Sequence, residues 1–454
     1  MNFYRTILSL SIASLLTACG GSSNDDKPTT TPPPSGTNPP PVTQIEYKVI
    51  DGYLANAEVC IRATATADCN LVGKTDENGV IKIASDKKGQ LVATIKAGET
   101  TDKDIVGFVG NSYQMVADIS ASTPNVITPF TTLDALDTKK SMDDIAADLD
   151  LPKDLLAGDY VASEADKSAH VHAIARSFTK QLAPSEKDND VAQLHTDAKV
   201  INDYINTELA NNDTDLDTVN VTIENGKAEH EKKISKLEDF LEGRPLYFAS
   251  LNSYHRKDEG VFKVSLADGK IIKNGNVTGS YSIDGDILKF GDESDKYIYT
   301  SDNIALAVPQ ENVKDLILSS PNNFELKDGT RVKPFTKEEF VGNSIYTLWD
   351  DSLNPTPKPF LASFTFAESK VSVDDGKESF ETTWFIERGK LIIVLPEDKK
   401  ASDRERGLEL IRTISSPDVT IIHDVGAPNR AESLMFKDEN LARTVHSKWI
   451  SASK

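Results

Sequence analysis

The segment GSYSIDGDILKF, residues 279–290, decides how the C-terminal half of the chain is interpreted. Apolar and polar residues alternate on both sides of Asp284-Gly285, and an Asp-Gly turn between two alternating segments is typical of a β-hairpin. A similar segment follows about a hundred residues later, where Trp384-Phe-Ile386 leads to Leu391. The sequence therefore predicts antiparallel strands in both places.

Working outward from this segment, the last two hundred residues contain an internal repeat. The paired positions are separated by 99, 102 and 103 residues, which fits one unit of about a hundred residues with small insertions. Chance alignment of two β-rich segments is the alternative. We predict two copies of a β-meander domain, over residues 242–335 and 336–454. The pairs are Gly243 with Gly342, Phe262 with Phe364, and Tyr281 with Trp384.

The region before the repeat, residues 137–241, is predicted to be a helical domain. Ser141 is suited to cap a helix, acidic residues follow it in the first turn, and Pro152 ends that helix. Two further helices are expected over 164–183 and 188–209, the last with apolar residues at helical spacing. These apolar stripes are interpreted as packed core.

Residues 45–136 are predicted to form a β-sandwich domain of short strands. The segment DGYLANAEVCI alternates around Gly52, and TDENGVIKI is a turn that leads into a strand. This arrangement resembles the transthyretin-like, carboxypeptidase-regulatory-like sandwiches found as modules in bacterial surface proteins. The C-terminal copies, in turn, resemble the lipocalin-like β-meanders of small secreted bacterial domains. The expected fold class is thus multidomain α+β.

The N-terminus has the pattern of an export signal, predicted over residues 1–18. Arg5 precedes an apolar stretch, residues 6–16, that is too short for the roughly 20 residues of a membrane-spanning helix. The stretch ends in Leu16-Thr-Ala-Cys19, which resembles the lipobox of bacterial lipoproteins and implies that Cys19 carries the lipid. Gly20 follows where an Asp would imply retention at the inner membrane. The resemblance therefore implies a lipid anchor in the outer membrane, with the face of the membrane left open.

Residues 19–44 are predicted to be a tether. The stretch is rich in Pro, Ser, Thr and Asn, and it lacks the apolar residues that a packed core requires. Extended at about 3.1 Å per residue, it would hold the folded part away from the bilayer.

The cysteine count agrees with export. Of three cysteines, lipidation uses Cys19 and leaves Cys60 and Cys69 as a pair. Disulfides form in oxidising compartments, so we predict that this pair is bonded.

Composition excludes several classes of function. The formal net charge is -21, and the resulting field repels a phosphate backbone, so nucleic acid is not expected as a partner. The chain lacks the Gly-x-Ser-x-Gly and P-loop signatures of familiar hydrolases and NTPases. We therefore expect a non-catalytic, envelope-anchored protein for binding or adhesion, with an unknown protein or glycan ligand.

Two alternatives stay open at this level. One is a structural or assembly accessory of an envelope complex, which docks a protein partner through its helical domain. The other is an enzyme that uses scattered carboxylates, which are too numerous among 71 acidic residues to mark a site by spacing alone.

Two groups of residues are candidate binding sites. Tyr254 and Trp349 are aromatic candidates, because large aromatic rings combine apolar area with a polar atom and Trp349 precedes a Pro-rich loop. A calcium loop is the second candidate, with carboxylates at positions 1, 3, 5 and 12, although position 6 is Thr218 in place of the usual Gly. A solvated acidic loop is the alternative there, and no other cofactor is expected. The calcium candidates are Asp213, Asp215, Asp217 and Glu224.

Overall fold

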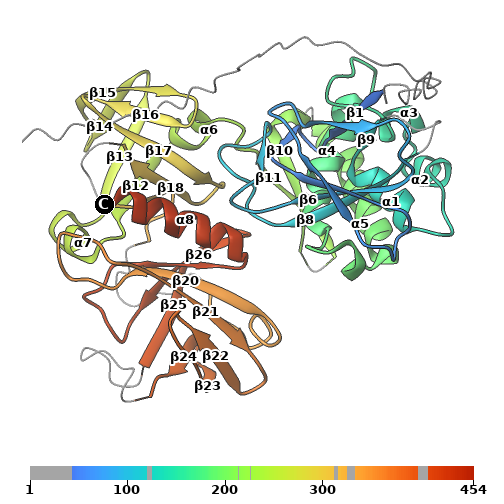
Figure 1. Ribbon diagram of the computed structural model, residues 1–454. Helices are drawn as coiled ribbons and strands as arrows, with labels where there is room; N and C mark the ends of the chain where they lie inside the picture. The colour runs from blue at the N-terminus through green and yellow to red at the C-terminus, as the bar shows by residue number, and fades with distance from the viewer. Residues whose placement is uncertain are drawn as a thin grey trace, which may run out of the picture. The chain divides into compact units, whose positions relative to one another are not determined.

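The computed structural model contains mostly strands, a helical middle and two C-terminal antiparallel barrels (Figure 1). The predicted α+β class is confirmed at that level. The predicted signal peptide, the lipidation site Cys19 and nearly all of the tether lie outside the described residues, whereas residues 43–454 pack as one unit. The structure describes residues 43–119, 125–212, 214–224, 226–310, 315–324, 333–396 and 407–453.

The N-terminal region contains three sheets. Apolar residues of the two larger sheets, including Val49, Val59, Ile81 and Leu91, belong to one core. The first sheet has β1 (Gln44–Val49) between β5 (Val80–Ala84) and β9 (Val126–Ile127); the second has the order β4 (Asn70–Lys74), β3 (Glu58–Arg62), β6 (Gly89–Ile95), β8 (Tyr113–Ile119); and β2 (Leu54–Ala55) pairs with β7 (Thr101–Asp102).

Cys60 and Cys69 form the predicted disulfide. Their Cα atoms are 5.5 Å apart, within the range that a disulfide requires. Cys60 lies in β3 and pairs with Leu71 of β4, the edge strand of the second sheet. The bond therefore closes the loop that connects β4 to the rest of its sheet.

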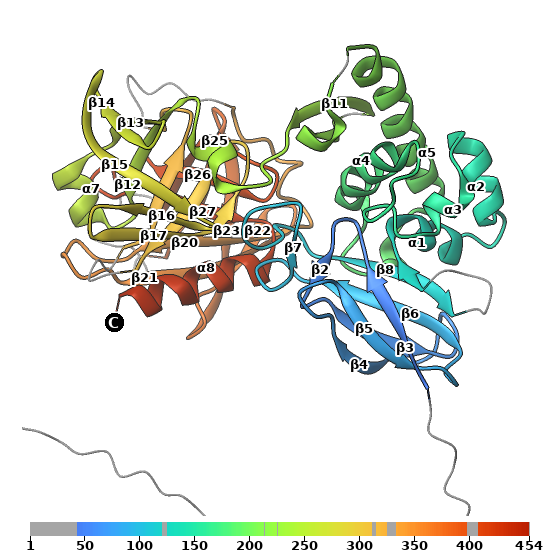
Figure 2. The ribbon, with the colours of Figure 1, turned by 90° about the horizontal axis from the view of Figure 1, so that it is seen from above.

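The helices of the middle region lie together on one side of β6 and β8 (Figure 2). Ser141 precedes α2 as predicted, and Oδ2 of Asp144 accepts hydrogen bonds from its backbone N and its Oγ, both at 2.8 Å. Asp190 caps α5 by accepting from two backbone N–H groups of the first turn. The helices are α1 (Pro129–Leu136), α2 (Met142–Leu149), α3 (Lys153–Leu156), α4 (Ser168–Phe178) and α5 (Val191–Tyr204).

The prediction of strands up to residue 136 was wrong for α1. Pro129 occupies the first position of this helix, where the missing N–H has no helical partner to lose. Thr128 and Thr131 hydrogen-bond to each other's backbone N–H groups at 3.1 and 2.9 Å, which caps the helix. The two threonines on either side of Pro129 were the local sequence signal for the start of α1.

The prediction of helix up to residue 241 was wrong for residues 219–232. There β10 (Val219–Glu224) and β11 (Lys227–Lys232) form an antiparallel hairpin, with Val221 opposite His230. Alternating β-branched residues favour a strand over a helix, and Gly226 has the positive φ, +73°, that a tight turn needs. A short helix, α6 (Leu237–Leu241), follows before the barrels.

Each barrel is a closed meander of eight antiparallel strands. Neighbours in the chain pair with each other, and the last strand pairs back with the first. The first barrel contains β12 (Pro245–Ser250), β13 (Phe262–Ala267), β14 (Lys270–Lys273), β15 (Asn276–Asp284), β16 (Ile287–Phe290), β17 (Glu293–Thr300), β18 (Ala305–Pro309) and β19 (Ile317–Ser320). The second contains β20 (Ser344–Asp350), β21 (Pro359–Phe366), β22 (Lys370–Asp374), β23 (Ser379–Glu387), β24 (Lys390–Val394), β25 (Gly407–Ser415), β26 (Val419–Asp424) and β27 (Ser433–Phe436).

The repeat seen in the sequence corresponds to these two barrels. Tyr281 and Trp384, which the sequence alignment pairs, lie on the fourth strand of their respective barrels, β15 and β23. The sixth strands, β17 and β25, both have a shift of register, the first after Tyr297 and the second after Arg412. The C-terminal half thus contains two antiparallel β units with the same strand order, and the strands of each close into a barrel.

The last helix, α8 (Glu439–Ala452), lies between the two barrels (Figure 1). Trp449 and Val445 are fully buried, in one apolar cluster with Leu318 of the first barrel and Leu348 of the second. Gly98 of the N-terminal region also meets this helix, because a β-carbon there would lie 2.6 Å from Oγ1 of Thr444. One core thus joins three parts of the chain.

A polar contact also joins the barrels, at α7 (Ser253–Glu259). The buried carboxylate of Asp350, at the end of β20, accepts hydrogen bonds from Asn252 Nδ2 at 2.9 Å and from the backbone N of Ser253 at 3.0 Å. Beside it, Arg256 of α7 donates to Glu432 of the second barrel at 2.9 Å. Because these charges are largely buried and paired, they fix how the barrels meet.

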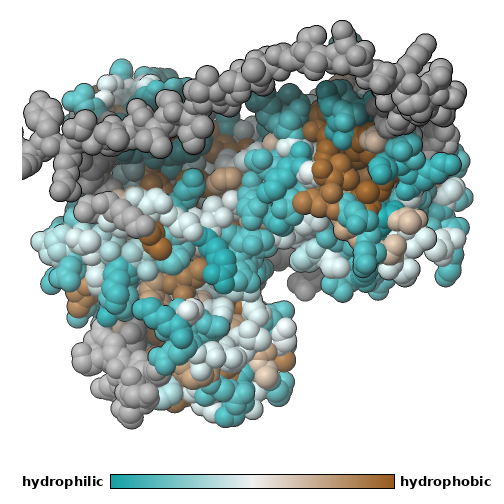
Figure 3. Space-filling view, viewed as in Figure 1, coloured by the Kyte–Doolittle hydropathy of each residue, from teal (hydrophilic) through white to brown (hydrophobic). Residues whose placement is uncertain are grey.

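The face in Figure 3 is mainly hydrophilic over the barrels, and apolar side chains gather over the N-terminal and helical parts. Among the residues that the structure describes, no helix has the length and apolarity needed to span a membrane.

Candidate ligand-binding cleft

A cleft of about 1030 Å³ lies where the N-terminal region, the hairpin β10–β11 and both barrels meet. Its walls include the loop between β7 and β8, the turn after α4, the end of β17 and the connection between β25 and β26. Small-molecule sites in proteins usually have volumes of about 300–1,000 Å³. The cleft is therefore large enough for a ligand, and it is the candidate site.

The floor of the cleft depends on the Asp51-Gly52 pair of the sequence. Asp102 lies in β7, which pairs with β2, and its carboxylate is packed against Gly52. A β-carbon at position 52 would be 2.1 Å from Oδ1 of Asp102, far inside van der Waals contact. Glycine at this position thus makes room for a second carboxylate beside Asp51.

Asp51 is only 3% exposed, yet it lines the cleft. Its Oδ2 accepts a hydrogen bond from the Tyr113 hydroxyl at 2.8 Å, whereas Oδ1 has no hydrogen-bond partner among the described residues. The Thr179 hydroxyl nearby donates its proton to the carbonyl of Arg176 at 3.0 Å. Burial raises the pKa of Asp51 to about 6, against the effect of the Tyr113 hydrogen bond.

Asp104 is the carboxyl group of the floor whose pKa is lowered. Burial opposes its ionisation, but the contact with His172, 2.6 Å from Nε2 to Oδ2, and the buried ammonium of Lys233 at 3.4 Å outweigh it and lower the pKa of Asp104. The pKa of Asp102 is raised well above its usual range by burial and by the charges of Asp51 and Asp104. The floor therefore holds, side by side, carboxyl groups whose pKa values are shifted in opposite directions.

Arg176 of α4 contributes the donor at the floor. Its Nη2 and Nε donate to the Val219 carbonyl at 2.9 and 3.3 Å, which attaches α4 to the hairpin β10–β11. Its Nη1 is buried, makes no hydrogen bond within the described chain and lies 4.0 Å from a carboxylate oxygen of Asp217. The guanidinium thus supports the hairpin through Nη2 and Nε, while its Nη1 makes no hydrogen bond within the described chain.

The barrels supply the opposite wall. The Tyr299 hydroxyl lies 3.2 Å from Oγ of Ser416, and Asp418 beside it has its pKa raised to about 6 by burial. Arg412 forms an ion pair with Glu339 and lies over an aromatic ring of the second barrel. This wall therefore presents charges of both signs.

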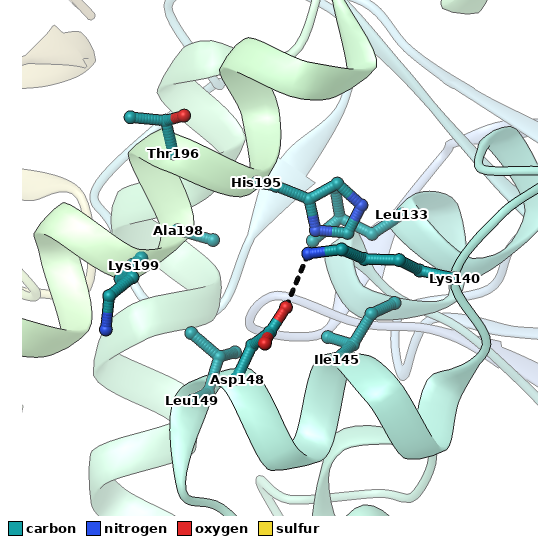
Figure 4. A pocket seen from close by; sticks show the side chains of 9 residues that line it. All are labelled: Leu133, Lys140, Ile145, Asp148, Leu149, His195, Thr196, Ala198 and Lys199. Atoms are coloured by element: carbon teal, nitrogen blue, oxygen red, sulfur yellow. Dashed lines mark hydrogen bonds and ion pairs between the residues drawn. The ribbon is translucent and has the colours of Figure 1, made fainter.

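A second hollow, of about 250 Å³, lies among the helices (Figure 4). Lys140 and Asp148 form an ion pair across it at 2.5 Å, beside the ring of His195. His195 in turn has Nε2 2.9 Å from Asp137. Since these polar groups already pair with one another, this hollow offers a ligand less than the floor of the cleft.

The aromatic residues predicted as ligand contacts lie outside the residues that line the cleft. Tyr254 is on α7, 39% exposed, with its ring edge-on to His255. Trp349 is on β20, partly buried, with its ring centre 4.6 Å from that of Phe360. The structure does not bring the two rings together in a ring contact.

The residues of the predicted calcium loop are spread over a turn and a strand. Asp213 and the side chain of Glu224 lie outside the described residues. Asp215 caps a short 3-10 turn by accepting from the backbone N of Asp217 at 3.0 Å, and Glu224 ends β10. No cluster of three or more His, Cys, Asp or Glu side chains in the described ranges is arranged to hold a metal, so calcium stays a prediction.

The sequence interpretation missed the floor of the cleft entirely. Its charged groups come from separate segments, and each is one of many similar residues in an acidic chain. The one local signal was the Asp51-Gly52 pair, which was interpreted only as part of a strand pattern. The missed residues are Asp51, Asp102, Asp104, His172, Arg176 and Lys233.

Comparison with known proteins gives no family for this chain. No family model matches it, and no curated protein matches it. Among solved structures, a protein of unknown function from the DUF3598 family of Nostoc punctiforme is similar over 44% of this chain and 96% of that protein, with 12% sequence identity and a TM-score of 0.19. A likeness at that score is too weak to extend to function.

Proposed function

We propose that this protein is a non-catalytic, lipid-anchored binding protein of the bacterial outer membrane, which holds its ligand in the cleft. The observation that carries the proposal is the cleft itself, with a polar floor of buried charged groups and a volume of about 1030 Å³. Binding is favoured over catalysis because Asp104 is held in ion pairs with His172 and Lys233, an arrangement that keeps it fixed.

The anchor rests on the lipobox-like sequence that ends at Cys19. Cys19→Ser is expected to release the protein from the membrane fraction as an unlipidated form. Membrane fractionation and intact mass would reveal the loss of the acyl chains, with Cys60→Ser as the control that removes a different cysteine. Unchanged fractionation and mass of the Cys19 variant would count against the anchor.

We also propose the finer folds that the sequence resemblances imply. The shared core of the two larger N-terminal sheets supports a transthyretin-like sandwich. The closed eight-stranded meanders support a lipocalin-like description of the C-terminal copies. An experimental structure of the full chain is the direct test of both assignments.

The binding role is tested by blocking the cleft. Asn111 lines it and is partly exposed, so Asn111→Trp is expected to fill space that a ligand needs. The protein would be purified from its native envelope in mild detergent, and bound molecules would be identified by native mass spectrometry.

The matched control for this experiment is Asp258→Trp, which places the same side chain on an exposed position of α7 away from the cleft. A molecule that accompanies the parent and the control but is lost from Asn111→Trp supports the proposal. A parent protein that carries no molecule, or a molecule retained by Asn111→Trp, contradicts it. Capture of a protein partner independent of the cleft would support the assembly role instead.

A further inference from the structure

Two buried polar atoms at the floor of the cleft have no hydrogen-bond partner among the described residues: Oδ1 of Asp51 and Nη1 of Arg176. Asp51 is 3% exposed and Arg176 is 6% exposed. Leaving a buried polar atom unpaired costs about 1–3 kcal/mol, so such atoms are uncommon in native structures. Their position at the floor of a large cleft indicates that a ligand supplies the missing partners.

The pair defines the chemistry of that ligand. Oδ1 of Asp51 can only accept when ionised, whereas Nη1 of Arg176 can only donate, so the ligand must present a donor and an acceptor. A hydroxyl group does both, and neighbouring hydroxyls on a sugar ring do so side by side. Planar carboxylate and guanidinium groups suit such paired contacts.

Charge argues for a neutral ligand. The chain carries a net charge of -21, which repels anions. A cation at the floor would meet the guanidinium of Arg176 and the ammonium of Lys233, which is 3.4 Å from Asp104. Neither a free anion nor a free cation is therefore favoured over a neutral polar molecule.

Apolar side chains also line the cleft. Phe108 lines the cleft and is partly exposed, as is Ile105 on the same loop. A flat aromatic face next to hydrogen-bonding groups suits the apolar face of a sugar ring.

We propose that the cleft binds a neutral oligosaccharide, with Asp51 and Arg176 as the hydrogen-bonding pair at its floor and Phe108 as its apolar wall. The inference rests on the proposed binding function and adds the class of ligand. It gives Asp51 a role in binding, whereas the segment around it was interpreted from the sequence only as part of a strand pattern.

The test uses the full-length protein in detergent. An array of neutral, acidic and amino-sugar oligosaccharides identifies ligands, and titration calorimetry with the best neutral oligosaccharide measures affinity. Asp51→Asn keeps the shape of the side chain but replaces the carboxylate with a neutral amide, which offers the ligand only one acceptor oxygen. We expect about 10- to 100-fold weaker binding for this variant. Phe108→Ala is expected to weaken binding about 10-fold.

Asp295→Asn is the matched control. It makes the same chemical change at a partly buried aspartate, on β17 and outside the cleft, and the affinity of this variant is expected to equal that of the parent. Thermal unfolding of each variant shows whether the protein is folded, so lost binding is not confused with lost structure.

Three results would overturn the inference. If Asp51→Asn binds the oligosaccharide with the affinity of the parent, the proposed contact with Asp51 is wrong. If the protein binds only anionic sugars or zwitterionic peptides, the ligand is not a neutral sugar. Absence of any oligosaccharide binding, while Asn111→Trp still displaces a molecule that accompanies the parent, would refute the sugar and leave the binding cleft intact. If Asn111→Trp displaces nothing either, the binding function itself fails.

Discussion

The two barrels share a strand plan but fill their interiors differently. In the second barrel, Trp384 lies against Phe340 and Phe366, with ring centres 5.9 and 4.9 Å away. In the first, the equivalent Tyr281 is buried and donates a hydrogen bond to Glu242, and Tyr297 and Asp295 follow on β17. One interior is an aromatic cluster, and the other contains groups that titrate. The same sequence of strands thus tolerates two kinds of core.

The largest effect is expected from the aromatic cluster. Trp384→Ala should lower the free energy of unfolding by about 3–5 kcal/mol, because it leaves a cavity among packed rings. Urea denaturation followed by far-UV circular dichroism measures the loss. Phe385→Ala is the control, since the neighbouring ring is 40% exposed and should cost under about 1 kcal/mol. Equal losses for both variants would show that the second barrel does not depend on this cluster.

The next largest effect on stability is expected at the polar contact between the barrels, around Asp350. Asp350→Ala should cost about 3 kcal/mol, because it removes the acceptor of Asn252 Nδ2, of the Ser352 hydroxyl and of three backbone N–H groups, those of Ser253, Ser352 and Lys358. Scanning calorimetry should show the barrels unfolding at separate temperatures in this variant. In Asp351→Ala, which loses a more exposed ion pair with Lys358 at 2.8 Å, the parent's single transition should persist. A single unshifted transition for Asp350→Ala would contradict the coupling.

The titrating interior of the first barrel predicts a dependence on pH. Burial, followed by the charge of Glu293, raises the pKa of Asp295 to about 6, above the value of about 3.9 in an unfolded chain. The unfolded chain therefore releases its proton first, and stability falls as the pH rises from about 4 to about 6. Asp295→Asn should remove about 3 kcal/mol of this fall.

Urea denaturation at pH 4, 5, 6 and 7 measures that slope. Asp292→Asn, at an exposed position, should leave the slope as in the parent. A slope unchanged by Asp295→Asn would mean that other carboxyl groups carry the whole dependence, such as Asp418, whose pKa is also raised to about 6.

The smallest effect on stability is expected from a substitution of Tyr281, which occupies in the first barrel the position of Trp384 in the second. Tyr281→Phe keeps the ring and removes the hydroxyl that Glu242 accepts from, which should cost about 1 kcal/mol. The exposed Ser282→Ala is the control, with a change of less than about 0.5 kcal/mol. A loss above about 3 kcal/mol for Tyr281→Phe would mean that the polar contact, rather than ring packing, supports the first barrel.

Local signals made much of the fold predictable. Asp284-Gly285 and its counterparts predicted hairpins from turn chemistry, and the spacing of Tyr281 and Trp384 predicted the repeat. Barrel closure was beyond such signals, because β12 pairs with β19 across seven intervening connections, and no local pattern encodes that pairing. The hairpin at 219–232 was also missed, because the long segment around it was predicted as a whole to be helical.

The candidate site was less predictable than the fold. Asp51 and Asp102 meet only because β2 pairs with β7, and His172 reaches Asp104 only because α4 packs beside them. Nothing in the spacing of these residues sets them apart among the 71 acidic residues and seven histidines of the chain. A buried charged cluster assembled from distant segments is a property of the tertiary structure.

The position of α8 has a consequence for the order in which the molecule matures. Trp449 and Val445 complete a core that also contains residues of both barrels, and α8 follows every strand of both barrels in the chain. The apolar side chains of β18 and β20 in this core therefore stay uncovered until α8 has packed against them. During that interval the barrels present apolar surface to chaperones and proteases, so the docking of α8 acts as the closing step of folding.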